Sequence, residues 1–416
     1  MPSTVACESL PARREAALRF LYERIDYERA LAAPYGIRDF KLDRMRELLD
    51  RVGNPQQNLP IVHVAGTKGK GSTTVMIAAA LTAAGYRTGA FTSPHLDCVE
   101  ERLAIDGQPC SAEELIELVE YVAPIVREMD RLAAGGPAAE SGPTYFEITT
   151  ALALLRFARH RAGAAVLEVG MGGRLDSTNV CQPQVAVITS ISFDHMRQLG
   201  NTLGAIAREK AGIIKPGVPV VSGVEEEEPR EVIRQTCRRL GCTLAELGVD
   251  FHYRYRPPLG LENAPSPSRL DFIYPALDGE FDLHDLAIAL AGRHQAANAA
   301  VAVAALVELT RIGWNIPAAA IRQGLAGVLW PARAEVVARR PVVVIDAAHN
   351  LASVAALVRL LDESFSARRR LLVFATTQEK DLRGMLACIL NRFDHVIFTR
   401  YLNNPRAVDP EELNDL

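Results

Sequence analysis

Residues 61–72 read IVHVAGTKGKGS, an apolar run that enters a glycine-dense loop, and an alanine-rich segment follows. This order predicts a strand, a phosphate-binding loop and a helix over about 73–84. The glycines Gly66, Gly69 and Gly71 allow backbone N–H groups to approach phosphate oxygens without a Cβ clash. The spacing G-x-x-G-K-x-S lacks the first glycine of the full P-loop pattern.

Two side chains of this loop suit a nucleoside triphosphate. Lys70 supplies a mobile positive charge, and Ser72 supplies a hydroxyl for Mg²⁺ at the positive end of the helix. Only six of the 46 basic residues are lysines, so a retained lysine indicates a chemical requirement that Arg does not meet. The alternative is a glycine-rich turn that binds no ligand, which the strand before and the helix after disfavour.

Composition excludes several classes of protein. A chain of 416 residues with 49% hydrophobic content predicts two or three domains. The net charge of -4 gives no indication of a nucleic-acid partner. We expect a soluble cytoplasmic protein without membrane partners, because no long apolar run and no signal-peptide core are present. Seven scattered cysteines without a C-x-x-C pair predict neither disulfides nor structural zinc.

The remaining pattern predicts an α/β protein. Helical periodicity covers 14–52, Ser111 with Glu114 predicts a capping box for a helix to about residue 129, and Thr144 begins another helix. Strands are predicted in the segments 87–92, 164–170, 185–191 and 219–223. The segments 164–170 and 185–191 are continuous apolar runs, which are typical of parallel strands buried on both faces.

The C-terminal part restarts this alternation. Prolines and short alternating segments over 243–285 predict an antiparallel excursion, and a helix follows from about 294 to 310. Further strands are predicted at 342–347, 370–376 and 395–400. We therefore expect a P-loop-containing parallel-sheet ATPase domain at 1–322, a linker at 323–331 and a smaller Rossmann-like domain at 332–416.

Polar residues follow several predicted strands. Ser72, Ser93, Glu168 and His195 would share one crevice, because ligands bind at the carboxyl ends of parallel strands. Oxygen and imidazole ligands around a triphosphate suit Mg²⁺ or Mn²⁺. His195 alone would be interpreted as a hydrogen-bonded loop histidine. The loop GMGGRLDSTN after Glu168 is too glycine-rich and polar to be expected in the packed interior.

Two further sites could contribute to the chemistry, a single lysine and a cluster in the second domain. Lys210 is either a solvated helix charge or a lysine carbamylated into an anionic metal ligand. Asp346, His349 and Asn350 follow a strand of the second domain, and Arg333 lies on the segment entering it. A nucleotide and a second substrate enclosed between two such sheet edges would be protected from water by domain closure.

The blocks HVAGTKGKGS, TSPHL, ERLAIDG, LEVGMGGRLDSTNV, DH followed by LG, REKAGIIKPG, GRHQAANA, WPAR and DAAHN occur in this order. Together they resemble the folylpolyglutamate synthase and dihydrofolate synthase family within the Mur-ligase-like ATP-dependent amide ligases. The resemblance covers residues 15–416.

The resemblance implies a set of roles for single residues. Gly69 to Ser72 would hold the ATP phosphates, and Asn298, Arg333 and Asp346 would bind the rest of ATP. Mg²⁺ would be bound by Ser72, Ser93, Glu168, His195 and carbamylated Lys210. His349 would lie near the incoming glutamate, with Lys70 and Lys210 as the other catalytic residues. The pterin would contact two segments, Thr144, Tyr145, Phe146 and Glu147, and Leu175, Asp176 and Ser177.

Some positions depart from the family pattern. Lys68 replaces a common Asn, and Ala332 and Ala347 replace common glycines. Family members usually add a further strand and helix after the position of Leu416.

The implied reaction joins a folate or dihydropteroate carboxylate to L-glutamate through an acyl phosphate, with ATP and Mg²⁺ and with the enzyme as a monomer. Both acceptors are expected, positioned by the segment from Lys41 to Arg44 or the loop 133–143. The alternatives are a Mur-type peptide ligase, a P-loop kinase or GTPase, and a nucleotide-binding protein that has lost catalysis.

Overall fold

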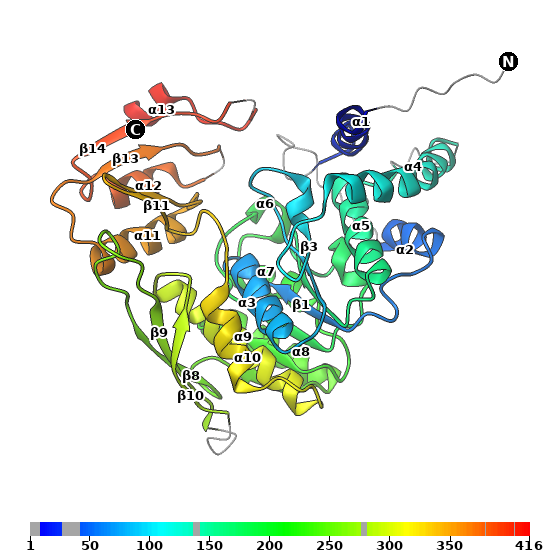
Figure 1. The fold of residues 1–416 in the computed structure, drawn as a ribbon, viewed down its shortest axis with the longest axis horizontal. Helices are drawn as coiled ribbons and strands as arrows, with labels where there is room; N and C mark the ends of the chain where they lie inside the picture. Colours follow the sequence, from blue (N-terminus) through cyan, green and yellow to red (C-terminus); the bar gives the residue numbers. More distant parts are fainter. Residues whose placement is uncertain (1–8, 27–41, 136–141, 276–280, 379, 403) are drawn as a thin grey trace. The chain divides into compact units, whose positions relative to one another are not determined.

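The computed structural model describes residues 9–26, 42–135, 142–275, 281–378, 380–402 and 404–416 (Figure 1). The chain forms two compact units, Met1–Val249 with Val301–Gly324, and Asp250–Ala300 with Leu325–Leu416. No helix within the described ranges has the length and apolar character needed to cross a membrane.

The first unit contains a seven-stranded sheet in the order β3-β2-β4-β1-β5-β6-β7. Neighbouring strands are parallel except for β2 and β3. Every residue of β1, β2, β4 and β5 is buried, as the apolar runs predict. The strands are β1 (Ile61–Ala65), β2 (Thr88–Phe91), β3 (Leu103–Ile105), β4 (Ala164–Glu168), β5 (Val185–Ile188), β6 (Val220–Ser222) and β7 (Leu244–Glu246).

Helices follow most of these strands, which confirms the predicted βα alternation. The helices are α1 (Leu10–Tyr22), α2 (Leu42–Arg51), α3 (Lys70–Ala83), α4 (Ala112–Ala134), α5 (Tyr145–Arg159), α6 (Met196–Leu199), α7 (Leu203–Ala211) and α8 (Glu227–Leu240). Two short 3₁₀ segments are η1 (Val99–Arg102) and η2 (Ser177–Val180). The predicted helical stretch 14–52 includes residues 27–41, which lie outside the described ranges.

Two apolar clusters pack against different strands of the sheet. Ile61 and Leu167 pack with α4 and α5, whereas Ala65 and Ile188 pack with α7 and α8. Successive strand residues alternate between faces, so Ile61, His63 and Ala65 share one face. His63 is therefore a polar residue on an otherwise apolar face of the central strand.

One prediction about helix capping is wrong. Ser111 accepts the Glu114 N–H, but the Glu114 carboxylate pairs with Arg156 at 2.8 Å and does not complete a capping box. A complete capping box lies instead at Thr144 and Glu147, where each side chain accepts the other residue's backbone N–H. Burial explains the difference, because Arg156 is only 6% exposed and needs a carboxylate partner.

The described residues of the second unit form three smaller sheets. These are β10-β9-β8 and β11-β12, both antiparallel, and the parallel pair β13-β14. Their strands are β8 (His252–Arg256), β9 (Ser268–Ile273), β10 (Leu283–Ile288), β11 (Glu335–Arg339), β12 (Val342–Ile345), β13 (Leu371–Phe374) and β14 (His395–Phe398). Its helices are α11 (Leu351–Ser364), α12 (Leu382–Ile389) and α13 (Pro410–Asp415), and α9 (Arg293–Arg311) and α10 (Ala318–Gly327) belong partly to each unit.

The predicted antiparallel excursion begins later than 243. Residues 244–246 form β7, which pairs in parallel with β6 at the edge of the large sheet. The antiparallel strands β8 to β10 contact α11 within the second unit, since the Tyr255 hydroxyl donates to Glu363 at 3.0 Å and Leu261 N–H donates to the Ser364 carbonyl at 3.1 Å. The domain boundary at 323–331 stays a prediction.

Candidate active site

The phosphate loop connects β1 directly to α3. Gly69 has a left-handed backbone, with φ of 83°, and precedes Lys70, the first residue of α3. A Cβ at Gly66 would lie 1.9 Å from the Thr189 hydroxyl, so this position requires glycine. Ser72 lies in the first turn of α3 and is 4% exposed. The predicted strand, loop and helix are therefore all present, and the free N–H groups of the first turn are available to an anion.

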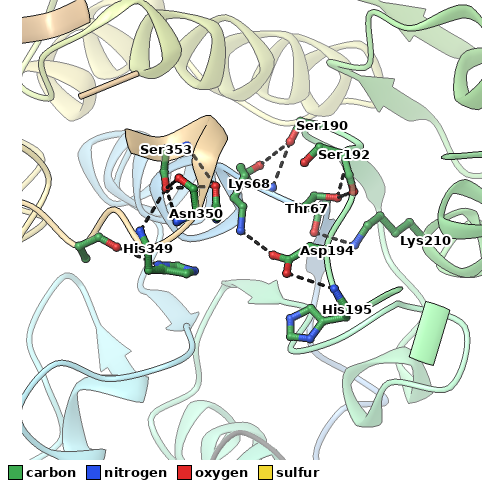
Figure 2. A network of polar contacts seen from close by, with 12 residues as sticks. Thr67, Lys68, Ser190, Ser192, Asp194, His195, Lys210, His349, Asn350 and Ser353 are labelled. Atoms are coloured by element: carbon green, nitrogen blue, oxygen red, sulfur yellow. Dashed lines mark hydrogen bonds and ion pairs between the residues drawn. The ribbon is translucent and has the colours of Figure 1, made fainter. Parts of the chain in front are cut away.

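The segment after β5 is bound to this loop along its length (Figure 2). Thr67 N–H donates to the Ser190 carbonyl at 2.8 Å, and the Thr67 hydroxyl donates to the Ser192 carbonyl at 3.2 Å. The Lys68 carbonyl accepts the Thr189 hydroxyl at 2.6 Å. These bonds fix the loop backbone and leave its other groups to a ligand.

Glu168 and Ser93 lie together at the carboxyl edge of the sheet. Glu168 ends β4 and is 4% exposed, and its Oε2 accepts the Ser93 N–H at 3.0 Å. β4 pairs with both β1 and β2, so this carboxylate lies on the strand between the phosphate loop and Ser93. A buried carboxylate at this edge is suited to a cation. The metal-binding roles of these two residues stay a prediction.

Lys210 is a buried lysine, not a solvated helix charge. Its side chain is 4% exposed, and Nζ donates to the Gly66 carbonyl at 2.8 Å. Burial, with the nearby charge of Lys70, lowers its pKa from 10.5 to about 7. The interpretation of Lys210 as a solvated charge on a helix is therefore wrong. The amine contacts the phosphate loop itself.

The glycine-rich loop after Glu168 is a packing element, which corrects the expectation from the sequence. A Cβ at Gly173 would lie 2.9 Å from the Glu209 carbonyl and 3.1 Å from that of Lys210, so the loop fits tightly against the end of α7. Asp176 is buried, and its carboxylate accepts the N–H groups of Met171 at 2.9 Å and Thr178 at 3.0 Å. Burial is the main cause that raises the pKa of Asp176.

A polar contact attaches this loop to the central strand. His63 is fully buried, and its Nε2 lies 2.8 Å from the Thr178 hydroxyl. Burial lowers the pKa of His63 to about 3, so the ring is neutral at physiological pH. The Ser177 hydroxyl lies 3.0 Å from that of Thr150 on α5. Asp176 and Ser177 thus have internal partners, and Leu175 beside them is half-buried.

The predicted pterin segment 144–147 also has internal partners. Glu147 pairs with Arg44 at 2.8 Å, with side chains 9% and 16% exposed, and Tyr145 is fully buried. Phe146 lies against Phe91, with ring centroids 5.6 Å apart. Thr144 and Glu147 form the capping box of α5. The substrate contacts of this segment stay a prediction, and Lys41 and residues 136–141 of the proposed acceptor segments lie outside the described ranges.

Glu147→Ala is expected to destabilise the fold by about 2–4 kcal/mol, because it removes the largely buried ion pair with Arg44 and half of the capping box. Urea unfolding of the purified variant measures this loss. The matched control is Glu120→Ala, which removes the exposed partner of Arg13, where a change below about 1 kcal/mol is expected. Equal stability of the two variants would contradict the structural role of Glu147.

The second unit brings together Arg333 and Asp346. The Asp346 carboxylate accepts the N–H groups of Ala334 at 2.8 Å and Ala348 at 2.7 Å. Burial raises the pKa of Asp346, and these bonds and the Arg333 charge oppose that increase. Ala332 has φ of 53°, a left-handed backbone that fits the glycine common at this position.

The other predicted residues of this unit have local contacts. His349 Nδ1 lies 2.9 Å from the Ala347 carbonyl (Figure 2). Because a carbonyl only accepts, Nδ1 carries the proton and Nε2 is the basic nitrogen of the neutral ring. Asn350 caps α11 by accepting the Ser353 N–H at 3.0 Å, and Asn298 on α9 donates to Gln295 at 3.0 Å.

Sequence reasoning missed the residues that hold the phosphate loop in place. They are the hydroxyl residues Thr67, Thr189, Ser190 and Ser192. The run TSIS at 189–192, directly after a buried strand, was the available signal, since three hydroxyl residues among four are unusual in a core segment.

Comparison with known proteins agrees with this architecture. The family model of the Mur ligase middle domain matches residues 64–306, and that of the Mur ligase glutamate ligase domain matches residues 332–416. The dihydrofolate synthase/folylpolyglutamate synthase of Bacillus subtilis is 38% identical over 379 residues, which are 90% of this chain and 84% of that protein.

Solved structures give the same result. Mycobacterium tuberculosis folylpolyglutamate synthase complexed with ADP and AMPPCP matches with a TM-score of 0.85 and 34% identity, covering 97% of this chain and 86% of that one. A structure described as an FPGS–AMPPCP–folate complex matches with a TM-score of 0.80 and 32% identity, covering 92% and 88%.

The phosphate loop, the acidic sheet edge and the two matched domains define an ATP-dependent ligase built on Mur ligase domains. The chain belongs to the folylpolyglutamate synthase and dihydrofolate synthase family. Both the predicted family and the predicted α/β fold class are confirmed.

Proposed function

We propose that this enzyme joins L-glutamate to the carboxylate of a folate or a dihydropteroate, with hydrolysis of ATP to ADP and phosphate. The observation that carries the proposal is the phosphate loop with Lys70 at the start of α3, beside the buried carboxylate of Glu168. The relatives named above support the choice of acceptor, since one is a dihydrofolate synthase/folylpolyglutamate synthase and another is described with folate. Cytoplasmic location and a monomeric state stay predictions.

The donor set fits Mg²⁺. Ser72 and Glu168 supply hard oxygen atoms in buried positions, and Ser93 N–H orients the carboxylate. The Lys210 amine fits only after carbamylation, which converts a repelled cation into an oxygen ligand. The low pKa of Lys210 favours this reaction, because the neutral amine is the form that reacts with carbon dioxide. Bound at this edge with His195, Mg²⁺ would neutralise charge on the phosphates.

The residues of the chain then have defined tasks. The acceptor carboxylate attacks the γ-phosphorus, the bond to the β-phosphate oxygen breaks, and Lys70 stabilises the transferring phosphoryl group. The glutamate amine next attacks the acyl carbon, and phosphate leaves. The amine must lose a proton in this step, and His349 Nε2 is suited to accept it. Arg333 and Asp346 are proposed to bind the remainder of ATP.

Both acceptors are expected to support turnover, although their reacting carboxylates lie at different distances from the pterin. The assay is ADP release with ATP, Mg²⁺ and L-glutamate, with dihydropteroate or tetrahydrofolate added in turn. Reactions without glutamate serve as the control for simple ATP hydrolysis. Turnover with only one of the two acceptors would refute bifunctionality but not the ligase activity.

The same assay tests the alternatives. A Mur-type peptide ligase would use neither pterin, and a protein that has lost catalysis would bind nucleotide without glutamate-dependent ADP release. A P-loop kinase would release ADP without forming an amide, which mass spectrometry of the product distinguishes. The two matched Mur ligase domains disfavour the kinase.

A further inference from the structure

We propose that Lys68 is a positioning residue, whose ion pair with Asp194 holds His195 and the segment after β5 against the phosphate loop. The inference rests on the function proposed above only for its effect on catalysis. The attachment itself is a property of the fold that is measurable without substrate.

The contact is short and partly shielded from solvent. Lys68 Nζ lies 2.6 Å from Asp194 Oδ2, with side chains 30% and 13% exposed (Figure 2). The second carboxylate oxygen, Oδ1, accepts the His195 N–H at 3.1 Å. One carboxylate therefore binds the cation of the phosphate loop and also fixes the backbone of the next residue.

The backbone at His195 needs such support. His195 has φ of 48° and ψ of 41°, a left-handed conformation that is unfavourable for residues other than glycine. Its side chain is exposed, so packing in the core does not impose this conformation. The ion pair supplies a constraint at the residue directly before it.

The pair also extends a series of bonds along the same segment. Thr67 contacts Ser190 and Ser192 through backbone and hydroxyl groups, at 2.8 Å and 3.2 Å. The Lys68 side chain continues this attachment two residues further, to Asp194. Successive residues of the phosphate loop thus bind successive parts of one segment, which ends at the predicted metal ligand His195.

The two lysines of the loop consequently have different tasks. The Lys68 ammonium is paired with a carboxylate of the protein, whereas Lys70 lies at the first position of α3. Removing the Lys68 charge should therefore act through the placement of residues 193–195. Its effect should resemble the loss of a residue that orients a metal ligand, which typically costs about 10–100-fold in affinity or activity.

Hydrogen exchange of the full chain tests the attachment without ligand. We expect amide exchange in residues 193–199 to be about tenfold faster than in the wild type in both Lys68→Met and Asp194→Asn. The double variant should exchange no faster than either single variant. Arg13→Met is the matched control, since it breaks a 2.7 Å ion pair with Glu120 elsewhere in the same unit. Unchanged exchange in Lys68→Met, or additive effects in the double variant, would overturn the proposal.

Kinetics test the consequence for the reaction. We expect Lys68→Met to raise the KM for Mg-ATP about tenfold with a smaller change in kcat. Lys68→Arg, which keeps the positive charge, should raise this KM less. A kcat effect as large as that of Lys70→Ala, with KM unchanged, would overturn the positioning role. Faster exchange in Lys68→Met, with a wild-type enzyme inactive toward both acceptors, would refute the proposed function and leave the attachment standing.

Discussion

Lys70→Ala is expected to lower kcat for glutamate-dependent ADP release by about 10²–10³-fold, because the side chain stabilises charge that develops on the transferring phosphoryl group. Lys70 lies in the first turn of α3 and is half-buried, so little packing is lost. The free energy of unfolding should change by less than about 0.5 kcal/mol. Steady-state assays and urea unfolding of the same preparation measure both quantities.

The matched control is Arg208→Ala, which removes an exposed charge from α7. It tests whether loss of any positive charge in this unit slows the enzyme. Near wild-type ADP release by Lys70→Ala would show that the loop does not bind the γ-phosphate.

Lys210→Ala is expected to abolish turnover, because the carbamate would supply an anionic oxygen that no other side chain at this position replaces. Short carboxylates such as formate or acetate should restore part of the activity by occupying the space left by the lysine. A wild-type crystal with ATP bound should show the carbamate directly. A bare ammonium distant from the metal, or full activity in Lys210→Ala, would contradict carbamylation.

Burial of the Lys210 amine should lower the free energy of unfolding. The pKa of Lys210 is about 7 in the folded protein and near 10.5 when solvated, so the unfolded chain binds more protons between these values. Stability of the metal-free protein should therefore rise from about pH 7 to pH 10.5, and the full penalty should apply below pH 7. Lys210→Met should be more stable by roughly 1–4 kcal/mol at pH 6, with a gain that shrinks as pH rises. Equal pH profiles for the two proteins would refute this.

The sequence predicts those features that depend on neighbouring residues. The strand, loop and helix over 61–83 follow from one continuous pattern, and the edge position of Glu168 follows from the geometry of parallel strands. The blocks that resemble the family identify the reaction class. These features are expressed within about ten residues each, so no tertiary information is needed.

Contacts between distant residues were not predictable in this way. Lys68 and Asp194 are 126 positions apart, and Arg44 and Glu147 are 103 apart. The sequence gives no sign that the loop after Glu168 packs tightly, for the same reason: Gly173 is required by the Glu209 and Lys210 carbonyl groups of α7, and Gly170 by the Phe146 ring. Position in the sequence shows which groups a segment contains, and only the fold shows which of them have partners.

The central place of β1 has a consequence for synthesis of the protein. β1 pairs with β4 and β5, so the first of its partner strands is synthesised about 100 residues after β1 itself. Among the described pairings of the large sheet, only that of β2 with β3 is complete before residue 164. Since domains form as units during translation, the nascent chain carries an unpaired strand, apolar except for His63, for a long interval. A translational pause before residue 188 would prolong exposure of that strand, and chaperone binding to the nascent chain should be strongest over this interval.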